Sequence, residues 1–253
     1  MKRLTFKLLL VILALLVSTT AFTQQYRTVE KLVQMDKQSV NAWVMLVGNE
    51  PLDVLKEDFV RYARKQLKVK AKKEGRDMLI ARAAKIPTIS ALQGDLKARF
   101  FTENKENMLA LAFMPGYDIA LSSADNRTEM ANLRKFVEEF VKQYKIGQYQ
   151  EQLSVLASRK KNVERNYKKD KREQRKLNKS LKKIDKQLAS DKSEGPKKYA
   201  LNNQKIAKQS RIEALDKIMI NQKGELMKLD QEMQSIEASI KHLENMFSAS
   251  VNY

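Results

Sequence analysis

The sequence predicts an α+β fold, in which a small N-terminal antiparallel-sheet domain with two helices precedes a long antiparallel α-helical coiled-coil hairpin. Apolar residues recur at alternating intervals of three and four through the last hundred residues, and Gly195-Pro196 interrupts that pattern once. Before it, short β-type apolar runs alternate with turn residues. We therefore expect a signal peptide at 1–23, an α+β domain at 24–148, and a basic hairpin at 149–253 with its turn near 190–198.

The hairpin prediction depends on two heptad seams. The seam positions of the first arm are Leu153, Leu156, Lys160, Val163, Tyr167, Asp170, Gln174, Leu177, Leu181, Ile184 and Leu188. Those of the returning arm are Leu201, Lys205, Lys208, Ile212, Leu215, Met219, Gln222, Leu226, Leu229, Met233, Ile236, Ile240 and Leu243. If Leu188 faces Leu201, the numbers of facing residues add to 389, and apolar residues meet along most of the stem. The polar seam positions are expected either to loosen the stem or to fix its register.

The N-terminus has the layout of a secretory signal peptide. Met1-Lys2-Arg3 precedes an apolar run from Leu8 to Val17, and small and polar residues follow. The apolar run is short for a membrane span, which needs about 20 residues. We expect cleavage near 21–24 and a periplasmic or secreted mature chain, and a retained single-pass membrane anchor is the alternative.

The residue pattern from residue 26 to about 125 predicts a curved antiparallel sheet with two helices on one face. Val40–Val47 is apolar on both faces and predicts a buried strand, and Pro51 opens a helix that continues to Leu67. The further strand candidates are the alternating run 67–72, then 78–84, 96–101 and 108–114, and a last candidate at 117–121. Residues 125–128 cap the second helix.

Basic residues on the predicted strands suggest a second charged surface. Lys68, Lys70 and Lys72 would share one strand face, and Lys97 and Arg99 another. Together they would form a basic sheet surface opposite the helices, and the simpler interpretation is a solvated sheet face.

The charge of the chain is concentrated on one arm of the hairpin. The formal net charge is +19, and the first arm between Arg159 and Lys186 has fourteen Lys or Arg against four acids, whereas 199–247 is neutral. Such an excess attracts polyanions and acidic proteins. The predicted polyanion- or partner-binding residues are Arg159, Lys160, Lys161, Arg165, Lys168, Lys169, Arg172, Arg175, Lys176, Lys179, Lys182 and Lys183. A solubilising, self-repelling helix face is the alternative.

A second predicted binding feature is an apolar stripe on the returning arm. It consists of Ile218, Met219, Ile220 and Met227. These residues widen the apolar side of a helix that needs only a narrow seam, which favours a third helix from another subunit or a client. Packing against the first domain is the alternative.

No residue pattern predicts catalysis, a cofactor or a metal. The chain has no cysteine and one histidine, His242, at an outward heptad position, and its glycines form no phosphate-binding loop. We expect a non-enzymatic, chaperone-like binding or scaffolding protein of the cell envelope, which engages acidic proteins, envelope polyanions or unfolded clients and forms a homo-oligomer. Export argues against nucleic acid as the partner, and a membrane surface is a further partner class. The alternatives are a membrane-anchored envelope structural protein, and a small-ligand carrier or enzyme built on the N-terminal domain.

The mass of the mature protein tests the signal-peptide prediction. Intact-mass measurement of the protein isolated from its host should show a chain that lacks about the first 21 to 24 residues, because the small residues there suit cleavage. A chain that still begins at Met1 would instead support the membrane anchor.

Overall fold

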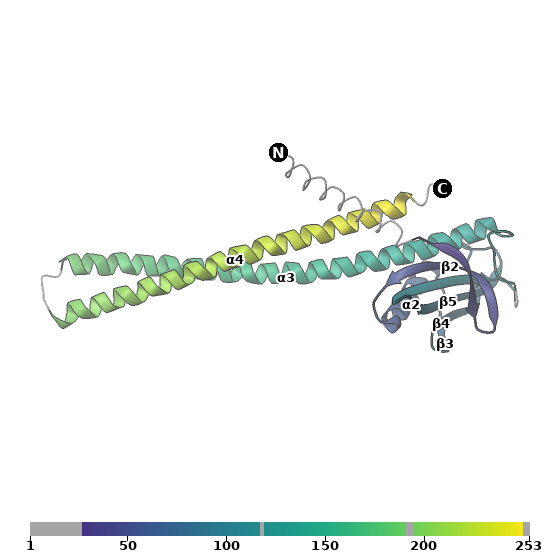
Figure 1. The fold of residues 1–253 in the computed structure, drawn as a ribbon, viewed down its shortest axis with the longest axis horizontal. Helices are drawn as coiled ribbons and strands as arrows, with labels where there is room; N and C mark the ends of the chain where they lie inside the picture. Colours follow the sequence, from purple (N-terminus) through teal and green to yellow (C-terminus); the bar gives the residue numbers. More distant parts are fainter. Residues whose placement is uncertain (1–26, 117–118, 191–194, 250–253) are drawn as a thin grey trace, which may run out of the picture. The chain divides into compact units, whose positions relative to one another are not determined.

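The computed structural model describes residues 27–116, 119–190 and 195–249 of the chain (Figure 1). The chain divides into two compact units, one made of residues 1–147 with 242–253 and the other of residues 148–241. The expected α+β fold with a helical hairpin is confirmed. The predicted signal peptide lies outside the described residues, and no helix among those residues is long and apolar enough to cross a bilayer.

The first unit contains a six-stranded antiparallel sheet with the strand order β1-β2-β6-β5-β4-β3. The elements are β1 Val29–Met35, β2 Gln38–Gly48, α2 Leu52–Leu67, β3 Lys72–Glu74, β4 Met78–Lys85, β5 Gln93–Glu103 and β6 Glu106–Met114. The β5–β6 turn is Asn104-Lys105, whose φ angles of 52° and 69° are both left-handed. This is the two-residue turn geometry that matches the twist of a hairpin.

Four of the predicted strands are confirmed, two strand candidates are wrong, and two strands, β1 and the short β3, are not among the predictions. Strand β1 was not expected, because it is an edge strand whose Leu32 remains 71% exposed and breaks the apolar pattern. The run 67–72 is not a strand, since Lys68 ends α2 in a left-handed conformation with φ 58°. Of the last candidate strand, the described residues 119–121 are irregular.

Both helices of this unit pack on one face of the sheet around Phe59. The Phe59 ring of α2 lies edge-on to Phe100 of β5, with centroids 5.7 Å apart, and to Phe140 of α3, with centroids 5.2 Å apart. Trp43 of β2 donates a hydrogen bond from Nε1 to the carbonyl of Met130, 2.7 Å away, which joins the sheet to the first turn of α3. These contacts hold the first part of α3 (Arg127–Ser190) against the sheet.

The opposite face of the sheet is not the free basic surface that the sequence suggested. Lys97 and Arg99 lie on that face, but Lys97 Nζ is 3.6 Å from an Asp36 carboxylate oxygen and Arg99 Nε is 2.7 Å from Asp77 Oδ2. Arg99 also donates to the Gln34 carbonyl. These ion pairs border a core of Val, Ala, Met and Ile side chains, and they neutralise the charges of Lys97 and Arg99 locally.

The second unit is the antiparallel helix pair formed by α3 and α4 (Pro196–Ala249) (Figure 1). Every predicted seam position of both arms is buried or half-buried, and Leu215 is fully buried. The predicted register is confirmed by pairs across the helices: the residue numbers add to 384 for Arg159–Glu225, 390 for Lys160–Asp230 and 392 for Asp170–Gln222, on either side of 389.

Several polar seam positions are paired across the interface. Lys160 Nζ lies 2.6 Å from Asp230 Oδ1, and Gln174 donates to Asp216. Gln222 donates to Asp170 at 2.8 Å, although its own Oε1 is buried without a protein partner. A register slip would separate these pairs, so the polar residues favour the observed register.

Truncation of a seam residue tests the packing of the helix pair. Leu215→Ala should lower the free energy of unfolding by about 2–5 kcal/mol, because it leaves a cavity between the helices. Urea unfolding followed by circular dichroism at 222 nm measures this change. Val155→Ala is the matched control, since Val155 is 63% exposed on α3, and its effect should stay within about 0.5 kcal/mol. Equal effects of the two substitutions would contradict the buried seam.

Candidate functional site

The outward side of α3 is almost entirely basic. If the seam residues are heptad positions a and d, the outward positions b, c and f between residues 161 and 186 number twelve, and eleven of them are Lys or Arg. The twelfth is Asn162. We call the eleven residues the basic face: Lys161, Arg165, Lys168, Lys169, Arg172, Arg175, Lys176, Lys179, Lys182, Lys183 and Lys186. All eleven are exposed.

Three of the four acids of this arm pair with residues of α4, and the eleven charges of the basic face outnumber all four acids. Glu173 accepts a hydrogen bond from Arg211 Nε at 2.8 Å, Asp185 pairs with Lys205 at 2.8 Å, and Asp170 accepts from Gln222. The hydrogen bond from Arg211 lowers the pKa of Glu173. Three of the four acids in this stretch are therefore engaged by the returning helix, and the positive charge of the outward positions is left uncompensated by them.

Two of the twelve residues predicted to bind a partner are paired with acids of α4. Arg159 donates from Nε and Nη2 to Glu225, at 3.0 and 2.7 Å. Lys160 is held by Asp230, and that hydrogen bond raises the pKa of Lys160. The other ten predicted residues lie on the basic face. Sequence reasoning missed Lys186, which its heptad position could have revealed.

The basic face has the dimensions of an extended polyanion-binding surface. At about 1.5 Å per residue, the stretch from 161 to 186 is about 37 Å long, so its eleven charges are spaced by about 3.7 Å along the axis. This is similar to the phosphate spacing of about 3.4 Å along one nucleic-acid strand. Neighbouring like charges at i,i+3 and i,i+4 cost a few tenths of a kcal/mol each in the free protein. A polyanion would remove that repulsion.

The predicted apolar stripe on α4 is divided by the seam. Met219 is 8% exposed and belongs to the interface with α3, whereas Ile220 and Met227 are 68% and 66% exposed. Ile218 is exposed to a smaller extent, at 40%. Two residues that sequence reasoning did not single out are also exposed on this helix, Tyr199 at 71% and Ile206 at 60%. Their spacing of seven from one another was visible in the sequence.

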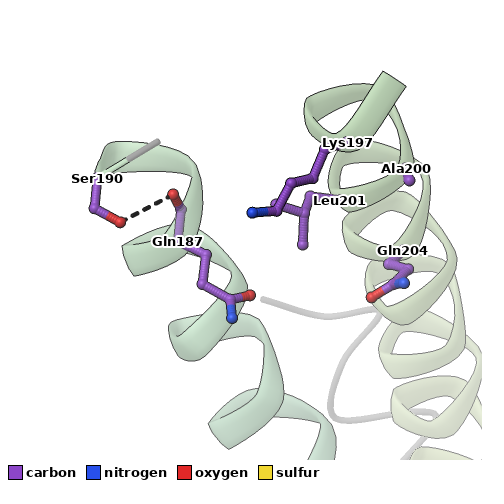
Figure 2. Close-up of a pocket in the computed structure, with 6 residues that line it drawn as sticks. All are labelled: Gln187, Ser190, Lys197, Ala200, Leu201 and Gln204. Atoms are coloured by element: carbon purple, nitrogen blue, oxygen red, sulfur yellow. Dashed lines mark hydrogen bonds between the residues drawn. The ribbon is translucent and has the colours of Figure 1, made fainter. Parts of the chain in front are cut away.

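A hollow of about 380 Å³ lies between the helix ends near the hairpin turn (Figure 2). Its lining consists of Gln187, Ser190, Lys197, Ala200, Leu201 and Gln204. The Ser190 hydroxyl donates to the Gln187 carbonyl across 3.1 Å, so this polar pair is satisfied within α3. The six lining residues include no carboxylate, histidine or cysteine, and they offer no acid–base pair for catalysis.

Three titratable side chains of the first unit, Tyr62, Tyr144 and Lys145, are partly buried. Burial raises the pKa of Tyr62 and of Tyr144, and burial lowers the pKa of Lys145 against the opposing effect of Glu50. Glu50 Oε2 is buried without a hydrogen-bond partner. Tyr62 packs against Phe136 and Phe140, with ring centroids 5.3 Å away in each case. The tyrosines of this group extend the aromatic core.

Other chemistry is sparse among the described residues. His242 is exposed, and residues 27–116, 119–190 and 195–249 contain no group of three His, Cys, Asp or Glu placed to hold a metal ion. Comparison of the chain with protein-family models, curated proteins and solved structures finds no match. The outward faces of α3 and α4 are therefore the candidate functional surfaces of the described residues.

The buried phenol of Tyr62 predicts a loss of stability at high pH. The folded protein keeps the Tyr62 proton above the ordinary pKa of 10.0, because burial disfavours the phenolate, and the unfolded chain releases it there. The stabilisation is complete below about pH 10 and is lost as the pH rises towards the folded-state pKa. Tyr62→Phe should therefore show a smaller fall in urea midpoint between pH 9 and pH 11 than the wild type. An equal fall in the two proteins would contradict the burial of this phenol.

Proposed function

We propose that this protein is a non-enzymatic binding or scaffolding protein of the cell envelope, whose basic face holds an extended polyanion or an acidic protein. The single observation that carries the proposal is the composition of the outward positions of α3, where eleven of twelve are exposed Lys or Arg. An ordinary solvated helix mixes charges of both signs. This face has only one sign over about seven turns.

The helix pair supports binding by keeping the cations in a fixed line. The seam orients α3, and the cross-helix pairs Arg159–Glu225 and Arg211–Glu173 hold its flanks against α4. A polyanion on a preorganised helix face does not have to order the backbone that presents the charges, which lowers the cost of binding. It also releases condensed counterions when it binds, so the affinity must depend strongly on salt.

The proposed location follows from the N-terminal segment. A basic start, an apolar run and small residues are typical of an export signal. An exported protein is separated from genomic DNA by the membrane. The suitable ligands are then phosphate- or carboxylate-bearing envelope polymers and acidic exported proteins. The basic face contains no aromatic residue, which gives bases nothing to stack on and disfavours a nucleic acid.

Salt-titrated binding to inorganic polyphosphate tests the proposal. Arg172→Gln/Lys176→Gln/Lys179→Gln should flatten the slope of log K against log salt by about 2 to 3, because each neutralised ligand charge contributes about 0.7–0.9 to the slope. Isothermal titration calorimetry at three or four salt concentrations measures it. The same titration with polyglutamate of equal charge distinguishes the two partner classes. Tighter binding of polyglutamate would favour a carboxylate-bearing partner, and tighter binding of polyphosphate would favour a phosphate polymer.

The matched control removes the same charge from the other helix. Lys217, Lys228 and Lys241 are exposed on α4, and Lys217→Gln/Lys228→Gln/Lys241→Gln should leave the slope almost unchanged. Equal losses in the two triple variants would show that only net charge matters. Binding that is independent of salt would overturn the electrostatic basis of the proposal.

A further inference from the structure

The outward face of α4 is as poor in charge as that of α3 is rich. Between Tyr199 and Met227 its b, c and f positions number thirteen, and only Glu213 and Lys217 are charged. These two are four residues apart, in the order that allows a local ion pair on the helix surface. The remaining positions are Tyr199, Ala200, Asn203, Ile206, Ala207, Ser210, Ala214, Ile220, Asn221, Gly224 and Met227.

The large apolar residues of this face have the spacing of a second helix–helix seam. Tyr199, Ile206, Ile220 and Met227 all occupy heptad position b, and each is at least 60% exposed. A strict seven-residue repeat keeps its members on one side of a helix that belongs to a coiled coil. We call these four residues the b-stripe. The b-stripe lies wholly within the second unit.

Small residues beside the b-stripe would allow another helix to approach closely. Gly224 lies between Ile220 and Met227 on the same side of α4, and a Cβ added there would meet nothing within 4 Å. Glycine inside a helix is destabilising relative to alanine. Nothing within the described fold requires Gly224, whereas a helix packed against this face would use the space that it leaves.

The b-stripe is symmetric about Glu213. Tyr199 and Met227 are each fourteen residues from Glu213, and Ile206 and Ile220 are each seven residues from it. An antiparallel copy of the same helix would therefore place Tyr199 against the Met227 of the second copy and Ile206 against its Ile220. A two-fold dimer requires this kind of self-complementary surface.

We propose that two copies of this chain associate as an antiparallel dimer through the b-stripes of their α4 helices, with the two-fold axis at Glu213. Charge determines which helices can meet, because two α3 basic faces repel each other and two α4 faces are nearly neutral. The two Glu213 side chains meet at the axis, where Lys217 of each copy lies one turn away. The dimer leaves both basic faces outward, and this inference does not depend on what they bind.

Cysteine cross-linking tests the symmetry directly, since the sequence contains no cysteine. Glu213→Cys in the full chain should form a disulfide-linked dimer on mild oxidation, because the two copies of residue 213 meet at the axis. The single variants Ile206→Cys and Ile220→Cys should not form a disulfide. In an antiparallel dimer, each new cysteine is about 21 Å along the helix axis from the same residue of the second copy. The double variant Ile206→Cys/Ile220→Cys should cross-link. Cross-linking by Ile206→Cys alone would indicate parallel helices and overturn the proposal.

Light scattering after size exclusion tests the stoichiometry. The wild-type chain should have twice the mass of one chain, and Ile206→Glu/Ile220→Glu should have the mass of one chain with unchanged helix content. Gln231→Glu/Ser235→Glu adds the same two charges to exposed positions beyond the b-stripe and should stay dimeric. A wild-type monomer or trimer would overturn the proposal. The polyphosphate slope per chain should be the same in the monomeric variant, so a failure of the dimer is distinguishable from a failure of polyanion binding.

Discussion

The buried seam between α3 and α4 is the constraint on which the rest of the second unit depends. Burial of the a and d positions removes apolar side chains from water, and it also fixes the rotation of each helix about its own axis. Leu215 is fully buried, and Met219 and Val163 nearly so. Once the rotation is fixed, every other residue of the two arms is assigned to a flank or to an outward face. The chemistry of the hairpin follows from that assignment.

The two outward faces have opposite characters, and the flanks explain how the difference is maintained. The acids on the flank of α3, such as Glu173 and Asp185, pair with Arg211 and Lys205 of α4. The acids of α4 hold Arg159 and Lys160 in return. These acidic and basic side chains are therefore paired between the two helices. What remains outward is nearly pure positive charge on α3 and a nearly uncharged, apolar surface on α4, which suit different partners.

The first unit shows the reverse outcome for basic residues on a regular element. Lys97 and Arg99 alternate along β5 as the basic residues of a solvated strand would, yet each has an aspartate within reach. The partners come from the β1–β2 turn and from the residue before β4, which are remote in sequence. A charge excess predicts a binding surface only where the fold brings no counter-charge to it.

The sequence by itself determined the hairpin, its seam and its register, because a heptad repeat and a single helix stop are local signals that need no knowledge of distant residues. It also determined the strands of continuous apolar character. Only the tertiary structure decided that β1 pairs at the edge, that Lys68 ends α2, and that Lys97 and Arg99 pair with Asp36 and Asp77. These outcomes depend on which residues meet across space, and propensity and periodicity carry no information about such pairs.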